Sequence, residues 1–85
     1  MPDKLIPDNV SVRKVIEAIG NNQLSVKEMM QLLSLADREN FLNNYLNPAI
    51  KAGFVRLLYP GTTRHPRQKY LLTVKGLAAL QELQP

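Results

Sequence analysis

The sequence contains no cysteine, so disulfide bonds do not hold the chain together and a reducing compartment suits it. It also lacks any apolar run near the roughly 18 residues that a membrane-spanning helix needs. The first residues, Met1 to Lys4, do not have the basic and then apolar build of a signal peptide. We therefore expect a soluble, cytoplasmic protein without a membrane partner.

Motifs for catalysis are missing as well. There is no Gly-x-x-x-x-Gly-Lys phosphate loop and no glycine-rich turn after a predicted strand. The one histidine, His65, stands between Arg64 and Arg67, without a cysteine or a nearby carboxylate to form a metal site or a nucleophile–base pair. We expect His65 to be a surface residue, and we predict that the chain is not an enzyme and uses neither metal nor cofactor.

The length of 85 residues predicts one domain, residues 1–85, with its core between about residues 9 and 83. A domain of this size buries only about 60 to 65 % of the surface that its unfolded chain exposes, so we expect modest stability. Hydrophobic residues make up 45 % and charged residues 21 %, a balance that favours an ordered domain. Because the length matches a single module, we expect the chain to be a fragment of a longer protein.

Positive charge is concentrated toward the C-terminus. Residues 1–50 carry five basic and six acidic side chains, whereas residues 51–85 carry six basic side chains and one acidic side chain, Glu82. The six basic residues are Lys51, Arg56, Arg64, Arg67, Lys69 and Lys75. This asymmetry indicates a polyanionic partner, with a merely solubilising surface as the alternative.

Two short helices are predicted in the first part of the chain. An apolar stripe at helical spacing indicates the first helix, which Asp8 or Asn9 can cap and Gly20 ends. The stripe consists of Val12, Val15, Ile16 and Ile19. The second helix begins with Ser25-Val26-Lys27-Glu28, a capping box in which the first and last side chains each accept a hydrogen bond from the other residue's amide.

A third helix is predicted over residues 38–52, with Asp37 as its cap. Its apolar ridges are Phe41, Tyr45 and Ala49 on one side and Leu42, Leu46 and Ile50 beside them, and we expect Phe41, Tyr45 and Phe54 in the core. Pro48 disagrees with the helical pattern because proline removes a backbone hydrogen bond and crowds the preceding turn. The helix either kinks at Pro48 or restarts there with Asn47 as a new cap.

After Gly53 the pattern changes from helical to extended. Residues 54–59 and 68–73 are rich in strand formers, and the polar loop between them is too long for a tight hairpin. This basic loop, which together with its flanking residues covers 60–69, is typical of the wing of a winged helix. Thr73 can cap a last helix. The predicted fold is therefore α+β and mainly α: a winged helix-turn-helix of three helices, a two-stranded β-hairpin wing and a closing C-terminal helix.

Three segments carry a family resemblance. They read Arg-Glu-Asn-Phe at residues 38–41, Tyr-Leu-Asn-Pro-Ala-Ile-Lys-Ala-Gly-Phe-Val at 45–55 and Gln-Lys-Tyr-Leu-Leu-Thr-Val-Lys-Gly at 68–76. Together they resemble the winged-helix domain of RecG-related DNA helicases or transcriptional regulators, a domain that also closes many Fic-like proteins. The resemblance covers residues 12 to 80 and implies a bacterial or archaeal regulatory context in a longer chain. The wing departs from the family pattern, because relatives tend to carry an acidic residue there, whereas the loop of this chain is more basic.

These observations predict a DNA-binding module. Helix 38–52 would enter the major groove and the wing, residues 60–69, would contact the minor groove or phosphates. Arginine suits guanine edges, asparagine suits adenine edges, and the wing cations suit phosphates. The predicted contact residues are Arg38, Asn40, Asn44, Asn47, Arg64, Arg67 and Lys69.

The alternative is a docking or intramolecular regulatory module without DNA binding. The proposed recognition helix is neutral in total, because Asp37 and Glu39 offset Arg38 and Lys51. Winged helices also bind proteins, so the fold alone does not decide the function, and other domains of the parent protein are possible partners. A lone domain should bind double-stranded DNA weakly, and we expect it to be a monomer in isolation.

Overall fold

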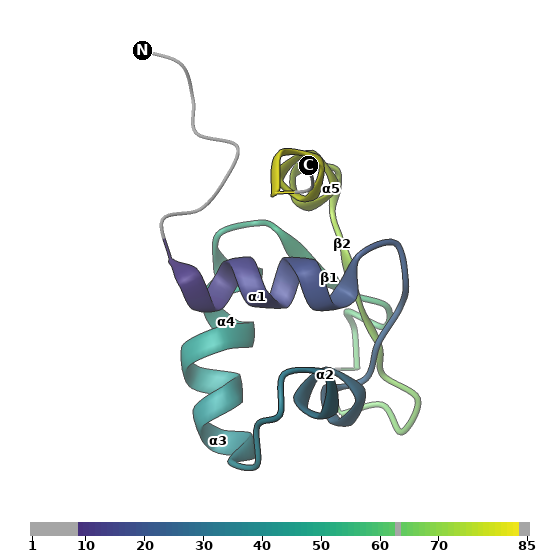
Figure 1. The fold of residues 1–85 in the computed structure, drawn as a ribbon. Helices are drawn as coiled ribbons and strands as arrows, with labels where there is room; N and C mark the ends of the chain where they lie inside the picture. Colours follow the sequence, from purple (N-terminus) through teal and green to yellow (C-terminus); the bar gives the residue numbers. More distant parts are fainter. Residues whose placement is uncertain (1–8, 63, 84–85) are drawn as a thin grey trace.

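The computed structural model describes residues 9–62 and 64–83, and Figure 1 shows their arrangement. In chain order the elements are α1 (Val10–Ile19), α2 (Val26–Leu32), α3 (Arg38–Phe41), the π-helical segment η1 (Leu42–Leu46), α4 (Asn47–Lys51), β1 (Val55–Leu57), β2 (Tyr70–Leu72) and α5 (Val74–Leu83). The predicted mainly helical α+β fold with a two-stranded hairpin is thereby confirmed. None of the helices in the described ranges combines the length and the hydropathy that a membrane crossing requires.

Side-chain caps fix where the first three helices begin. The Asn9 side chain accepts hydrogen bonds from two amides in the first turn of α1, at 2.8 and 3.4 Å, whereas Asp8 lies outside the described residues. At α2 the predicted capping box is confirmed, because Ser25 accepts from the Glu28 amide and Glu28 accepts from the Ser25 amide. Asp37 caps α3 as predicted, by accepting a hydrogen bond from an amide in its first turn.

The third predicted helix continues through α3, η1 and α4, but it contains one wide turn. The amide of Asn47 donates to the carbonyl of Leu42, five residues earlier instead of four. Pro48 explains the wide turn, because it has no N–H and its ring would collide with the carbonyl of Asn44 in a regular helix. No side chain caps α4, so a restart with Asn47 as cap is wrong, and the proline is accommodated in the first turn of α4.

The wide turn changes which side chains of this helix enter the core. Phe41, Leu46 and Ala49 are buried, with spacings of five and then three residues, so the predicted regular ridges are shifted. Tyr45, expected in the core, is only half-buried and stacks on Phe41 with ring centroids 5.8 Å apart. Phe54 is buried as predicted. The apolar stripe of α1 supplies the other side of the core.

The hairpin pairs antiparallel, with Val55 opposite Leu72 and Leu57 opposite Tyr70. Each strand has three residues, half the predicted length. Tyr70 also exchanges two backbone hydrogen bonds with Leu24, which lies between α1 and α2, at 2.8 and 3.0 Å. This bridge holds the start of α2 against the hairpin. Such a bridge cannot be predicted from the sequence, because a single paired residue has no periodicity.

Helix α5, yellow in Figure 1, packs against α1 and closes the core. The Thr73 hydroxyl accepts from the Gly76 amide at 3.1 Å, which confirms the predicted cap, and the Thr73 amide donates to the Phe54 carbonyl at 3.0 Å. Residue 76 must be glycine, because a Cβ there would lie 2.1 Å from the Phe54 carbonyl oxygen. Lys75 donates to the carbonyl of Ala52 at 2.7 Å, so its charge is engaged at the end of α4.

Candidate nucleic-acid interface

A groove of about 670 Å³ lies between the start of α2, the helix formed by α3, η1 and α4, and the wing. Its lining comes from residues 25–27 of the α2 start, from Arg38, Leu42 and Asn47 of the long helix, and from residues 64–66, Gln68 and Tyr70 of the hairpin and its loop. We call this hollow the wing groove. The bridge between Leu24 and Tyr70 sets its width, because it fixes α2 beside the hairpin.

Cations line the wing groove, and within residues 9–62 and 64–83 no acidic side chain contributes to its lining. Lys27, Arg38 and Arg64 are all exposed, and each comes from a different segment of the chain. Cations that converge on one hollow create a positive potential that attracts an anion. Of the predicted contact residues, the fold brings Arg38, Asn47 and Arg64 together here, from the helix and the wing.

The remaining predicted contact residues do not line the groove. The Asn40 and Asn44 side chains, one helical turn apart, hydrogen-bond to each other. Arg67 is exposed in the wing. The Nζ atom of Lys69 lies 3.0 Å from Oε1 of Glu28, in an ion pair. To contact nucleic acid, each of the paired side chains would have to give up its partner within the fold. The role of Asn40, Asn44 and Lys69 therefore stays a prediction.

Tyr70 contributes a neutral hydroxyl to the groove. Burial raises the pKa of its phenol, and the positive charge of Arg38 partly opposes that effect. A neutral phenol both donates and accepts hydrogen bonds. With the amide of Asn47 and the three cations, the groove thus presents the polar groups that suit phosphate oxygens and base edges.

Gln68 organises the wing, a role that the sequence analysis missed. Its Oε1 atom accepts from the amide of Tyr59 at 2.9 Å, and its Nε2 atom donates to the carbonyls of Tyr59 and Thr62 at 2.9 and 3.1 Å. The amide of Leu58 still donates to the carbonyl of Lys69 at 2.9 Å, and beyond that bond the side chain of Gln68 takes the place of backbone pairing at Tyr59. A glutamine beside a strand carries no sequence signal for such a role.

His65 is packed into the wing and is half-buried. Its imidazole stacks on Tyr59 with centroids 4.0 Å apart, and its Nδ1 atom accepts from the Arg67 amide at 3.0 Å. Among residues 9–62 and 64–83, no three His, Cys, Asp or Glu side chains gather in the way that metal ligands would.

Glu28 connects α2 to the second strand of the hairpin. Its Oε1 atom accepts from the Ser25 amide at 2.9 Å and from Lys69 Nζ at 3.0 Å. These two bonds, with the Ser25 amide first, are the main reason why the pKa of Glu28 falls from 4.5 to about 2. The Lys69 and Glu28 side chains are 38 % and 45 % exposed, so solvent screens the pair and its main effect is to position the strand.

The substitution Glu28→Gln should remove an acid-sensitive part of the stability. Because the pKa of this carboxyl is lower in the folded state, its stabilising effect is complete above pH 4.5 and is lost as the pH falls toward about 2. Thermal unfolding should show a Tm difference between wild type and variant that is constant near neutral pH and shrinks between pH 4.5 and 2. A difference that persists unchanged at pH 2 would contradict the assigned contacts of Glu28.

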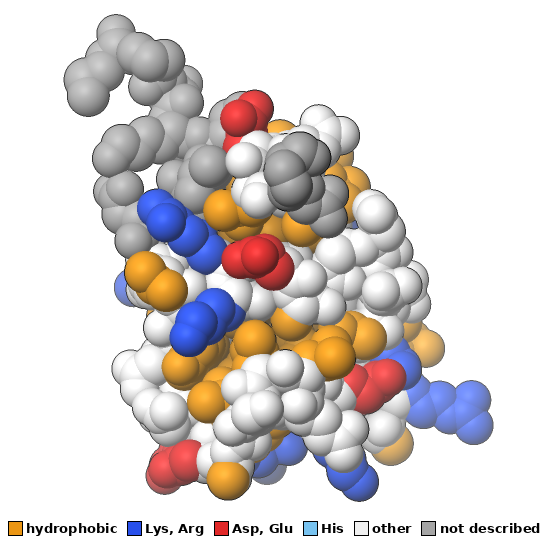
Figure 2. All heavy atoms as spheres, in the orientation of Figure 1, with side chains coloured by type: hydrophobic (Ala, Val, Ile, Leu, Met, Phe, Trp, Pro, Cys, Tyr) orange, Lys and Arg blue, Asp and Glu red, His pale blue; other side chains and the backbone are white. Residues whose placement is uncertain are grey.

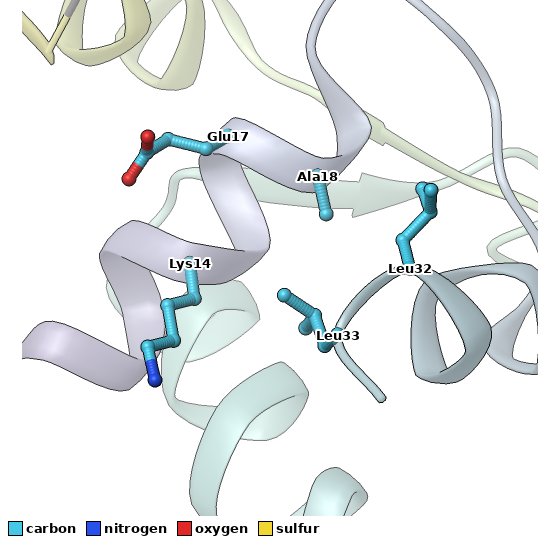
Figure 3. Close-up of a pocket in the computed structure, with 5 residues that line it drawn as sticks. All are labelled: Lys14, Glu17, Ala18, Leu32 and Leu33. Atoms are coloured by element: carbon cyan, nitrogen blue, oxygen red, sulfur yellow. The ribbon is translucent and has the colours of Figure 1, made fainter. Parts of the chain in front are cut away.

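A second hollow, of about 500 Å³, lies between α1 and α2 and shares no lining residue with the wing groove. Figure 2 shows hydrophobic side chains gathered across the face that carries these helices. In Figure 3, Lys14, Glu17 and Ala18 extend from α1, and Leu32 and Leu33 come from the end of α2. One cation and one acid line this hollow, so it lacks the positive charge that a polyanion requires.

Comparison with known proteins places the chain in a family. The family described as "Filamentation induced by cAMP protein Fic-like, C-terminal domain" matches residues 10–73. A crystal structure of a Fic family protein from Desulfovibrio desulfuricans G20 is similar, with 40 % sequence identity and a TM-score of 0.73. The match covers 81 % of this chain and 21 % of that protein, so the chain spans about a fifth of that relative's length. No curated protein gives a significant match. The Fic-like resemblance is confirmed, and the relation to RecG-related proteins stays a prediction.

Proposed function

We propose that this chain, which belongs to the family of Fic-like C-terminal domains, binds duplex DNA through the wing groove. The observation that carries the proposal is the convergence of Lys27, Arg38 and Arg64 on one groove whose described lining residues include no acidic side chain. Duplex DNA carries closely spaced phosphates on two strands, so it can satisfy several converging cations at once. A protein partner would have to supply a comparable density of acids.

In this proposal the helix formed by α3, η1 and α4 lies in the major groove and the wing follows the neighbouring backbone. Arg64 in the groove and Arg67 beside it would contact phosphates. The bonds that Gln68 makes to Tyr59 and Thr62 hold the first part of the wing, residues 59–62, in a defined shape before binding. Less conformational entropy is then lost when the loop meets DNA.

The two acids next to Arg38 do not cancel the charge of the groove. The Asp37 side chain accepts a hydrogen bond from the Asn40 amide, as the cap of α3. Neither Asp37 nor Glu39 is among the residues that line the groove. The total charge of the helix, which favoured the docking alternative, is therefore a poorer guide than the side chains that face the hollow.

The test is a salt series of fluorescence-anisotropy titrations with a random-sequence duplex. Lys27→Ala combined with Arg64→Ala removes two cations from the groove and should make the slope of log affinity against log salt shallower by about 2. The matched control, Lys51→Ala combined with Arg56→Ala, removes two exposed cations outside the groove. We expect the control to keep the wild-type slope within about 0.5 of a unit, which is less than one phosphate contact.

If the slope of log affinity against log salt changed equally in the two double variants, only net charge would matter, which contradicts binding through the groove. No binding by wild type at low salt would contradict DNA binding by this chain. With three to five phosphate contacts, a single module should bind only weakly, with about micromolar affinity at low salt. In a longer Fic protein the module would tether the rest of the polypeptide to DNA.

Protein docking is the second candidate function. The observation that favours it is Leu32, which is 62 % exposed beside the hollow between α1 and α2. The partner would then be another domain of the parent polypeptide. Absence of duplex binding at low salt would leave docking as the better supported function.

A further inference from the structure

The wide turn in the long helix determines which side chain follows Leu42 along the wing groove. In a regular α-helix Leu46 would come next on that face, and Asn47 would lie about 140° around the axis from Leu42. Here the Asn47 amide bonds to the Leu42 carbonyl, Leu46 is 1 % exposed in the core, and Asn47 lines the groove together with Arg38 and Leu42. The π-helical turn thus places a polar side chain where an apolar one would stand.

The Asn47 side chain is also available for a ligand. Within residues 9–62 and 64–83 its exposed carboxamide makes no hydrogen bond, whereas the carboxamides of Asn40 and Asn44 bond to each other. Of the three predicted asparagines, Asn47 alone lines the groove. A carboxamide carries a donor NH2 group beside an acceptor oxygen. These two groups can pair with the acceptor and the donor on the edge of an adenine.

We propose that Arg38 and Asn47 read base edges, so that the preferred ligand of this chain is a duplex with a guanine and an adenine about three to four base pairs apart. Arginine pairs with the two acceptors of guanine, and asparagine pairs with the acceptor and donor of adenine. Arg38 and Asn47 are nine positions apart, which corresponds to about 13 Å of helix. This length corresponds to about three to four base-pair steps of 3.4 Å. The inference rests on the proposed DNA binding and adds sequence selectivity to it.

The test begins by selecting binding sites from a randomised duplex library with the full 85-residue chain. The enriched duplex and a random duplex are then titrated by anisotropy with wild type, Asn47→Ala and Asn43→Ala. Asn43 is the matched control, because it is an exposed asparagine in the same wide turn that does not line the groove. Circular dichroism of each variant shows whether the helices are retained.

We expect the enriched sites to contain guanine and adenine at the stated spacing. Asn47→Ala should weaken binding to the enriched duplex roughly 5- to 150-fold, which is the range for one bidentate base contact. It should leave the affinity for random duplex within about 2-fold, and Asn43→Ala should leave both affinities within about 2-fold, because neither change removes a phosphate contact.

Several results would overturn the inference. If the wild type binds random duplex but enriches no common sequence, the inference is overturned and the proposed function is not. Equal weakening of both duplexes by Asn47→Ala would make Asn47 a backbone contact instead of a base reader. A wild type that binds no duplex at all would overturn both the proposed function and this inference.

Discussion

Replacing Phe41 with alanine is expected to lower the free energy of unfolding by about 3 to 5 kcal/mol. The Phe41 side chain is fully buried, and its ring stacks on Tyr45 with a centroid distance of 5.8 Å. A domain of 85 residues is stable by only about 4 to 13 kcal/mol, so this loss removes a large share of the stability, and at the lower end of that range it leaves the variant largely unfolded at 25 °C. Urea denaturation followed by circular dichroism measures the change.

The control for Phe41→Ala is Leu32→Ala. Leu32 is a large apolar residue on α2, but it is 62 % exposed, so its loss should change the free energy of unfolding by no more than about 0.5 kcal/mol. If Phe41→Ala cost less than about 1 kcal/mol, the core described around the wide turn would be wrong.

Gly76→Ala should be the second most damaging change, although alanine is a better helix former than glycine. Helix propensity alone would stabilise α5 by about 1 kcal/mol. The new Cβ, however, would lie 2.1 Å from the Phe54 carbonyl oxygen and 3.1 Å from Leu72 Cβ, so α5 would have to move away from the strands. We expect the overlap to prevail, with a net loss of about 3 kcal/mol in the free energy of unfolding.

Gly61→Ala is the matched control for this substitution. A Cβ at Gly61 would meet no atom within 4 Å. The same glycine-to-alanine change should therefore leave the denaturation midpoint close to that of wild type. A stabilised Gly76→Ala variant would show that α5 does not approach the first strand as closely as described.

The local architecture could be predicted where a few neighbouring residues determine it. Ser25 and Glu28 specify a capping box within four residues, and Asp37 and Thr73 each cap a helix whose amides are directly at hand. Gly53, with φ of 86°, ends the long helix in the left-handed conformation that glycine adopts readily. Short-range interactions of this kind can be predicted from the sequence.

The shape of the candidate site depends on interactions that the sequence does not display. The presence of Pro48 signals a disturbance, but whether the helix kinks, restarts or widens depends on how Leu46 packs in the core. The Lys69–Glu28 ion pair joins residues 41 positions apart, and the bridge between Leu24 and Tyr70 involves one residue on each side. Contacts at such separation follow from tertiary packing and have no local pattern.

The same limit applies to the positions of the predicted contact residues in the fold. Composition and charge drew attention to asparagines on the helix and cations in the wing, and the fold brings Arg38, Asn47 and Arg64 together at one groove. The sequence could not show that Asn40 and Asn44 bond to each other, because helical spacing allows that bond without requiring it. Lys27, on the second helix, was not among the predicted residues, since only the fold turns α2 toward the wing.

The most direct test of the central claim is an NMR titration of the chain with a random-sequence duplex at low salt. If the wing groove binds DNA, the largest backbone amide shifts should fall on residues 25–27, 38–47 and 64–70, and added salt should reverse them. Shifts centred on Lys14, Glu17 and Leu32 at the other hollow, or no shifts at all, would contradict DNA binding through the wing groove.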